Sequence, residues 1–414
     1  MAAPDTESAM APDPSGARLT RVWVAVGVSS LGDGAFLAAV PLAAAAVTRQ
    51  PWAVAAVTAA MYSPWFLVQP LAGALLERWS FRATMLIADF LRSAGVSLLA
   101  IVVALGRTNI PLLAATAFAM VLGQIFHDGA VQATVPELAG RTGAVLDRIN
   151  GRVYGAETAG KQLIGPPIGS ATFAVLASIP FAIDAMSFAV SGLLLAAVPH
   201  GLRTLRDGAH PPLLRAVWAG IVWLARHAQL RLLAIVSATA NLAYNCAWAT
   251  FVLLATDPHG LHLAPAGFGL LITAYAIGGV AGGLLAGRLN ARLTPIRALV
   301  LLALAHAIAW PVIALTNAVW ATGPLLAVIG AAQTMTTVTN VGLRQTLVPA
   351  DLLNRVTAAF RTLVNSASPL GAVIGGLVAT GFGLRAPLYL AGVVLFVVAL
   401  AVAPALGFRR PTPS

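Results

Sequence analysis

The chain has 414 residues, of which 59% are hydrophobic and only 9% are charged, whereas soluble domains carry about 25% charged residues. This composition excludes a soluble globular protein and indicates many membrane-spanning helices. The net charge of +11 would favour nucleic acid as a partner of a soluble protein, but in a membrane protein it fits basic cytoplasmic loops. The single Cys246 excludes a disulfide framework and a multi-cysteine metal site.

Apolar stretches separated by Arg, Pro, Gly and Asp clusters predict twelve transmembrane helices of about 20 residues or more each. An N-terminal six-helix half, residues 19–198, is expected to contain helices at 20–47, 52–77, 83–105, 110–135, 150–175 and 178–198. A C-terminal half, residues 229–408, is expected to contain helices at 229–255, 264–288, 297–317, 319–344, 355–380 and 384–407.

Three segments are expected outside these helices. Residues 1–18 contain Pro, Asp and Ser without an apolar run, which indicates a disordered cytoplasmic tail and not a signal peptide. Residues 409–414 form a second cytoplasmic tail. The linker 199–228 combines four arginines with Trp218 and Trp223, a pattern typical of an amphipathic helix on the inner membrane surface.

Basic residues are distributed unequally between the two sides of the predicted helices. Arg49, Arg107 and Arg385 lie in loops on one side, and Arg92 and Lys161 lie inside spans; the rest of the 25 Lys and Arg residues fall near the termini and in the loops of the other side. By the positive-inside rule, both termini are predicted to be cytoplasmic, with the protein in the cell inner (plasma) membrane. The bias accounts for the net charge, so no nucleic-acid partner is expected.

Two short motifs occur once in each half. The segment G-A-L-L-E-R at 73–78 recurs as G-L-L-A-G-R at 283–288, and L-D-R-I at 146–149 recurs as L-N-R-V at 353–356. Copies separated by six spans keep the same orientation across the membrane. The predicted fold is therefore an all-α integral membrane protein with twelve transmembrane helices in two parallel six-helix halves around a central cavity.

Several motifs resemble those of one transporter family. The pattern G-x-L-x-E-R-x3-R at 73–82 is similar to the signature of the major facilitator superfamily between helices two and three. The segments S-S-L-G-D-G at 29–34, V-P-E-L at 135–138, G-P-P-I-G at 165–169 and L-R-Q-x-L-V-P at 343–349 resemble the macrolide-efflux and enterobactin-exporter-like branch. The resemblance covers nearly the whole chain after Arg18 and implies transport by alternating access.

Asp33 is an acidic residue deep inside the first span, about 20 Å from its inner end at 1.5 Å per residue. Flanking Gly32 and Gly34 leave room for a neighbouring helix or a ligand. An ionisable side chain at this depth is costly and indicates a functional role. We expect Asp33 to exchange a proton, which agrees with its resemblance to first-helix acids of proton-coupled exporters; the structural alternative is a hydrogen bond to a backbone carbonyl or a serine.

Glu157 and Lys161 are four residues apart in the fifth span, and Lys161 is the only lysine in the chain. This spacing places both side chains on one helical face in the favourable acid-before-base order. Two interpretations remain open. The pair contributes to proton coupling or binds a polar group of the substrate, or it is an ion pair that only neutralises its own charges in the membrane.

The resemblance also implies a gate formed by the loop signature and an acid of the fourth helix. Here these residues are Glu77, Arg78 and Arg82 in the loop and Asp128 in the fourth span. An ion pair between them would stabilise the outward-open state and separate when the inner side opens. His127 is expected to point in a different direction from Asp128 and to be a packed histidine or, as the alternative, a proton relay.

Gly165, Pro166 and Gly169 resemble the end of the fifth-helix motif of antiporters, which implies export and not import. Proline removes backbone hydrogen bonds and kinks the helix, while glycine lets another helix approach closely. The alternative is that these glycines serve packing alone.

Polar residues in otherwise apolar helices of the second half are candidates for the substrate cavity, where a few polar groups orient a ligand among apolar surface. The alternative for each is a hydrogen bond between helices. The candidates are Asn241, Tyr244, Asn245, Gln333, Thr337 and Asn340.

The sequence contains no phosphate-binding loop, so ATP hydrolysis is not expected. It also lacks the His-Glu-x-x-His and Gly-x-Ser-x-Gly motifs of hydrolases. We therefore expect a protein that is not an enzyme, has no cofactor and no metal site, and works as a monomer in contact with membrane lipid. Its energy source is expected to be an ion gradient.

The predicted function is export of amphiphilic small molecules, such as macrolides and other antibiotics or siderophores, by proton antiport. The cargo class follows from the resemblance; the cavity residues alone indicate a partly apolar substrate that is not strongly anionic. Three alternatives remain open: a proton-coupled importer of the same fold, a lysolipid translocator, and a membrane sensor that binds a ligand without moving it.

Overall fold

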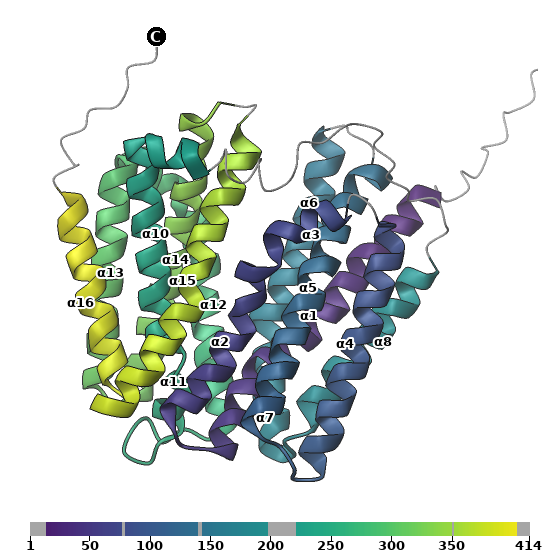
Figure 1. Ribbon diagram of the computed structural model, residues 1–414, viewed down its shortest axis with the longest axis horizontal. Coiled ribbons are helices and arrows are strands. Elements are labelled where there is room, and N and C mark those ends of the chain that lie inside the picture. Colours follow the sequence, from purple (N-terminus) through teal and green to yellow (C-terminus); the bar gives the residue numbers. More distant parts are fainter. Residues whose placement is uncertain (1–13, 77–78, 140–142, 198–220, 350–351, 404–414) are drawn as a thin grey trace, which may run out of the picture.

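The computed structural model describes residues 14–76, 79–139, 143–197, 221–349 and 352–403, and these form helices joined by short loops (Figure 1). The N-terminal group of helices comprises α1 (Pro14–Val47), α2 (Pro51–Leu67), α3 (Gln69–Leu76), α4 (Phe81–Ala104), α5 (Ile110–Ala139), α6 (Gly143–Thr158), the π-helix η1 (Ala159–Ile164), α7 (Gly165–Val175) and α8 (Ile179–Ala196). The C-terminal group comprises α10 (Ala228–Trp248), α11 (Phe251–Thr256), α12 (Pro265–Arg292), α13 (Pro295–Leu315), α14 (Val319–Leu347), α15 (Leu353–Phe382) and α16 (Ala386–Val402).

The predicted all-α membrane fold is confirmed, and each predicted span coincides with helical structure. In the described part of the chain, eight helices are long and apolar enough to cross a membrane, and α16 is a shorter apolar helix. Three predicted spans are interrupted: 52–77 consists of α2 and α3, 150–175 of α6, η1 and α7, and 229–255 of α10 and α11. Pro70 follows the first break, where its missing N–H is tolerated at the start of α3.

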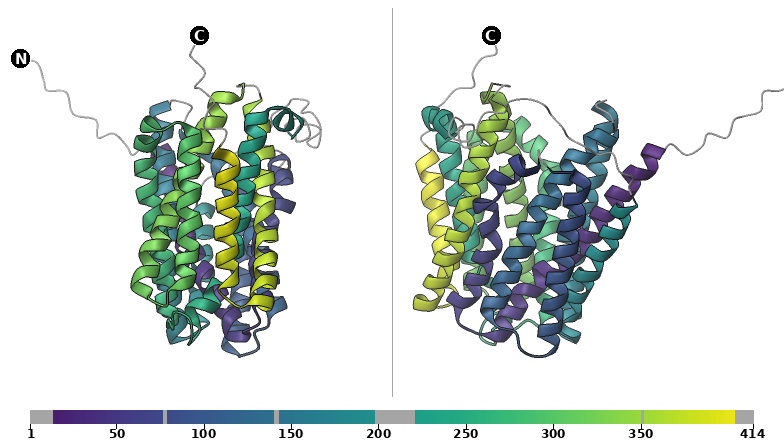
Figure 2. Two further views of the ribbon diagram at one scale, coloured as in Figure 1. Left: turned by 90° about the vertical axis from the view of Figure 1, so that its left-hand side faces the viewer. Right: turned by 45° about the vertical axis from the view of Figure 1, so that its right-hand side comes forward.

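The two helix groups stand side by side with their long helices running in roughly the same direction (Figures 1 and 2). In the N-terminal group, α1 packs against α8 and α7, and α4 packs against α8 and α5. In the C-terminal group, α12 packs against α14, α10 against α15, and α13 against α16. This agrees with the expected two halves, although residues 1–13, residues 409–414 and most of the linker 199–228 lie outside the described residues. Residues 221–226 of that linker are helical. Residues 14–18, predicted to belong to a disordered tail, are helical and begin α1.

The groups touch at the end of the molecule that carries the loops 48–50 and 257–264. Here α2 packs against α15, and α7 packs against α12. Small side chains allow this close contact: Ala55, Ala59, Ala249 and Ala372 form one buried cluster. Arg49 Nη1 donates to Thr256 Oγ1 at 2.9 Å across the same end. We call this contact region the closed end.

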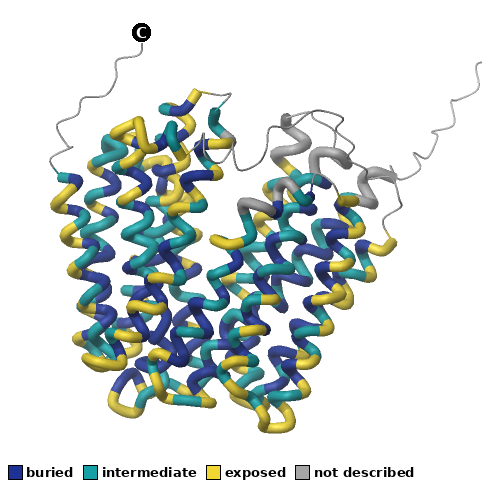
Figure 3. Tube along the Cα trace, viewed as in Figure 1, coloured by how far each residue is buried: buried dark blue, intermediate teal, exposed yellow. Residues whose placement is uncertain are grey.

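Toward the other end, from which the chain termini emerge, the helices of the two groups diverge (Figure 1). The tube view shows partly buried and exposed residues along the facing helices there, in contrast to the buried residues at the closed end (Figure 3). Phe66 and Leu67 at the end of α2 are 43% and 53% exposed. One hydrogen bond still joins the groups at this level, from Asn365 Nδ2 to Gln69 Oε1 at 3.2 Å.

Candidate functional site

Asp33 lies in the middle of α1 and forms an ion pair with Arg92 of α4. Arg92 Nη2 donates to Asp33 Oδ1. The Arg92 side chain is 2% exposed and that of Asp33 is 13% exposed, so the pair is removed from bulk water. The Arg92 guanidinium carbon also lies 4.0 Å from the centre of the Phe188 ring of α8. A cation–π contact of this kind gains strength when the cation is desolvated, and it holds the guanidinium between α1, α4 and α8.

Asp184 of α8 is a second carboxyl group beside this pair. Asp184 is completely buried, and neither of its carboxyl oxygens has a hydrogen-bond partner among the residues that the structure describes. It packs directly against the backbone of α1: a β-carbon added to Gly32 would lie 2.6 Å from Asp184 Oδ1 and 2.1 Å from Ser187 Oγ. Gly32 therefore brings α1 and α8 into contact at the residue next to Asp33.

A chain of three ionisable residues runs from the interior of the N-terminal group toward a more exposed position. Asp89 Oδ2 accepts a hydrogen bond from Ser191 Oγ at 2.7 Å, and Asp89 Oδ1 lies 3.6 Å from His127 Nε2. His127 Nδ1 lies 3.5 Å from Asp128 Oδ1. Asp89 and His127 are buried, whereas the Asp128 side chain is 33% exposed. The prediction that His127 points away from Asp128 is wrong, because its ring lies between the two carboxylates.

Glu157 and Lys161 both belong to the described part of the chain and are half-buried, and no ion pair joins them. The interpretation of the two residues as a mutual ion pair is therefore not supported. The reason is local: Lys161 belongs to the π-helix η1, whose wider turns change the direction of side chains relative to an α-helix. The N–H of Gly165 bonds to the carbonyl of Gly160, five residues earlier. Pro166 and Pro167 follow at once and have no N–H to donate.

The ionisable residues in the interior of the N-terminal spans carry an excess of acids. Two basic side chains, Arg92 and Lys161, stand among five carboxyl groups. These five are Asp33, Asp89, Asp128, Glu157 and Asp184. Charged side chains in a membrane interior are costly unless they are paired or neutralised. The excess therefore favours the binding of protons or of a cationic group in this part of the protein.

Asp89, Arg92 and Asp184 were not among the residues expected in the site. Each is an ionisable residue inside a predicted span, and this signal alone marks them as candidates. Their partners come from other helices, however, and the sequence gives no direct indication of which helices meet.

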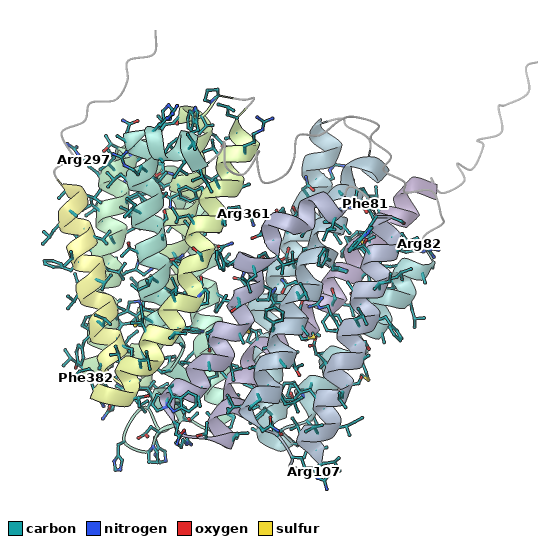
Figure 4. The ribbon with its side chains drawn as sticks, in the orientation of Figure 1. Phe81, Arg82, Arg107, Arg297, Arg361 and Phe382 are labelled. Atoms are coloured by element: carbon teal, nitrogen blue, oxygen red, sulfur yellow. The ribbon has the colours of Figure 1, made fainter. Side chains whose placement is uncertain are left out.

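The residues expected to form the gate are only partly described. Glu77 and Arg78 lie outside the described residues. Arg82 Nη2 donates to the carbonyl of Ala196 at 2.7 Å, at the end of the molecule where the termini lie (Figure 4). Asp128 Oδ2 accepts a hydrogen bond from Gln124 Nε2 at 3.2 Å, in addition to the contact with His127. The gate remains a prediction.

The glycines of the predicted antiporter-like motif pack against α1. A β-carbon on Gly165 would lie 2.6 Å from the Cα of Gly34, and one on Gly169 would lie 2.4 Å from the carbonyl oxygen of Ala35. Pro166 lies at the contact with the other helix group, because a β-carbon on Gly269 would lie 2.7 Å from its carbonyl oxygen. These positions fit the packing interpretation, and the link to transport direction stays a prediction.

Three of the candidate cavity residues in the C-terminal group use their side chains in hydrogen bonds inside that group. Asn241 Nδ2 donates to Val364 O and to Ser368 Oγ, both at 2.8 Å. Asn245 Nδ2 donates to the carbonyl of Asn241 at 2.8 Å, and Asn340 Nδ2 donates to Ser237 Oγ at 2.9 Å. These contacts match the alternative of structural hydrogen bonds.

The other three candidates have different surroundings. Gln333 lines a small cavity inside the C-terminal group together with His306 and Thr336. Thr337 is exposed and donates to the carbonyl of Gln333 at 3.0 Å. Tyr244 belongs to an aromatic cluster, with its ring centre 5.8 Å from those of Trp248 and Tyr275.

With the fold and these buried charges in place, comparison with known proteins identifies the family. A family model described as transmembrane secretion effector, of the major facilitator superfamily, matches residues 8–407. The chain belongs to this family. It is also 30% identical over 358 residues to the multidrug efflux pump Tap of Mycolicibacterium fortuitum, an alignment that covers 80% of this chain and 83% of Tap. The protein is therefore a multi-pass membrane transporter of small molecules.

Solved structures of transporters share the fold. The bacterial homologue of the iron transporter ferroportin in its inward-facing state has a TM-score of 0.76 at 16% identity, covering 94% of this chain and 99% of that one. The nucleoside transporter NupG has a TM-score of 0.73 at 13% identity, covering 94% and 100%. A bacterial homologue of the human lysosomal transporter Spinster, inward-facing and unoccupied, has a TM-score of 0.71 at 11% identity, covering 96% and 98%. At these identities the likeness concerns the fold alone.

Proposed function

We propose that this protein exports amphiphilic small molecules across the plasma membrane by proton antiport. The observation that carries the proposal is the buried ion pair between Asp33 and Arg92, set among further carboxyl groups in the middle of the N-terminal helix group. A transporter driven by protons needs a carboxylate whose charge changes during the cycle, and a buried site makes that change energetically large. The similarity to the multidrug efflux pump Tap supports export.

Asp33 is the coupling residue in this proposal. In the structure, the Arg92 guanidinium compensates its negative charge. A proton that binds to the Asp33 carboxylate removes that charge and thereby releases Arg92. The loss of the ion pair changes the contact between α1 and α4 and so changes the relative free energies of the two transport states. Glu157 and Lys161, which lack a mutual ion pair, are the further coupling candidates.

The orientation follows from the distribution of arginines. Arg82, Arg297 and Arg361 lie toward the end where the termini emerge, and Arg107 lies at the opposite end (Figure 4). With both termini in the cytoplasm, the closed end faces outside and the helix groups diverge toward the cytoplasm. This state is ready to receive a substrate from inside. The outward-open state would close the cytoplasmic end, where the gate of Glu77, Arg78, Arg82 and Asp128 is expected to form.

In this proposal, the substrate binds between an acidic side and an aromatic side. Asp128 and Glu157 contribute partly exposed carboxyl groups from the N-terminal group. Tyr244, Trp248 and Tyr275 contribute ring surface from the C-terminal group. Such surroundings suit a partly apolar molecule that is not strongly anionic, such as a macrolide. The protein works as a monomer in the lipid bilayer in this proposal.

The test is the accumulation of a radiolabelled macrolide in an efflux-deficient bacterial host. Cells that express the protein are expected to accumulate less macrolide than cells with an empty vector. An uncoupler that collapses the proton gradient should abolish the difference. Equal or higher accumulation in the expressing cells would contradict export of this substrate class.

A further inference from the structure

Two carboxyl groups lie beside one guanidinium in the N-terminal helix group. Asp33 accepts a hydrogen bond from Arg92, whereas Asp184 has no hydrogen-bond partner among the described residues and is completely buried. The charged groups that surround Asp184 from other elements are Asp33 of α1, Arg92 of α4 and Lys161 of η1. Both carboxyl groups therefore lie near the Arg92 guanidinium, but only Asp33 forms a hydrogen bond with it.

Arg92 is an electrostatic neighbour of Asp184 and shares a contact on α8 with it. The guanidinium lies over the ring of Phe188 at 4.0 Å, and Phe188 is one helical turn after Asp184, so both project from the same face of α8. Helices α4 and α8 are also held together locally, since Ser93 Oγ donates to the carbonyl of Ala185 at 2.9 Å. The exchange of one carboxylate for the other would require a change in the Arg92 side-chain rotamer.

We infer that Asp184 holds a proton while Arg92 is paired with Asp33, and that Arg92 alternates between these two carboxylates during the transport cycle. An ionised carboxylate without a partner in a dry interior is too costly to persist, and it binds a proton instead. Asp184 is in that position here. This inference rests on the proton antiport proposed above and identifies a second residue that carries the proton.

Charge and protons balance in the exchange. At the start, Asp33 is ionised, Arg92 is positive and Asp184 carries one proton. Once the protein opens outward, a proton from outside binds to the Asp33 carboxylate, and Arg92 loses its counterion. The Asp184 O–H bond then breaks, its proton passes to water, and the new carboxylate accepts the hydrogen bond from Arg92. One proton has entered and one has left, while the net charge of the three groups remains zero.

Infrared spectroscopy of the purified protein tests this assignment without any substrate. A protonated carboxyl group has a carbonyl-stretch absorption that a carboxylate lacks. We expect Asp184→Asn to remove this absorption in the difference spectrum against the unmodified protein. Asp33→Asn should remove it too, because Arg92 then pairs with Asp184 and Asp184 loses its proton. Asp257→Asn, in the loop between α11 and α12, is the matched control and should leave the absorption unchanged.

Two spectroscopic outcomes would overturn the inference. Loss of a carboxylate band in Asp184→Asn would show that Asp184 is ionised, and retention of the protonated band in Asp33→Asn would show that Arg92 is not shared. Gradient-driven uptake of radiolabelled erythromycin into proteoliposomes gives the second readout, and Asp184→Asn should lose it. If the unmodified protein transports no erythromycin, the proposed function fails while the infrared result still decides where the proton is held.

Discussion

Arg92 and Asp33 join α4 to α1 through an ion pair whose guanidinium is almost completely buried. The same guanidinium covers the Phe188 ring of α8. Three helices of the N-terminal group thus meet at one cation. A single side chain thereby links the packing of this group to the charge of the coupling carboxylate.

The first prediction concerns the stability of this ion pair. Arg92→Met leaves the Asp33 carboxylate without its counterion, and removal of one partner of a buried ion pair typically costs about 3–5 kcal/mol. We expect a clearly lower melting temperature of the purified protein in detergent. The double variant Arg92→Met/Asp33→Asn removes both charges and should recover much of the loss. A double variant less stable than Arg92→Met would contradict the account.

The second prediction separates transport from folding at Asp33. Asp33→Asn keeps the size of the side chain and removes its charge, while Asp184 remains as a counterion for Arg92. We expect the variant to be expressed and inserted normally but to lose uncoupler-sensitive export of a macrolide. Asp257→Asn, whose carboxylate accepts from the His259 N–H in a loop, should export normally. Full activity of Asp33→Asn would eliminate Asp33 as the coupling residue.

The third prediction tests the close contact of α1 with the π-helix. A β-carbon on Gly34 would lie 2.7 Å from the carbonyl oxygens of Gly160 and Lys161. Because both are backbone atoms, the helices must separate. Gly34→Ala is expected to destabilise the protein by about 1–3 kcal/mol, the usual cost of overpacking. Gly155→Ala, where a β-carbon meets no atom within 4 Å, is the matched control in α6. Equal melting temperatures of the two variants would show that the contact is not tight.

The fourth prediction concerns alternation between two states. Ala55 of α2 and Ala372 of α15 lie in the same buried cluster at the closed end. In a background with Cys246→Ala, cysteines at both positions should form a disulfide under oxidising conditions and arrest transport. A reducing agent should restore it. Each single cysteine variant serves as a control and should be insensitive to oxidation. Undiminished transport by the cross-linked protein would mean that the closed end does not open during the cycle.

The apolar spans and their order were predictable from the sequence, because a lipid environment requires long apolar helices whatever their neighbours. The broken span at 150–175 was predictable in part: Pro166 and Pro167 indicate a kink, but the π-helix before them depends on how Gly160 and Gly34 let two backbones meet. The ion-pair interpretation of Glu157 and Lys161, one of the two that the sequence left open, is not supported at this irregular turn.

Partners contributed by distant helices were not predictable. Asp33 was recognised from its depth in one span, but Arg92 and Asp184 acquire their role only when α8 packs against α1 and α4 packs against α8. Asn241 shows the opposite case. As a polar residue in an apolar helix it resembles a substrate contact, and only the position of Ser368 on α15 reveals its structural hydrogen bond.

The central claim is that a proton gradient drives export and that Asp33 couples proton entry to substrate export. Purified protein in proteoliposomes with an acidic interior tests it directly, with radiolabelled erythromycin outside. We predict accumulation inside as protons leave, abolition of this accumulation by a protonophore, and none with Asp33→Asn. Accumulation that is unaffected by the gradient, or that requires an alkaline interior, would contradict proton antiport.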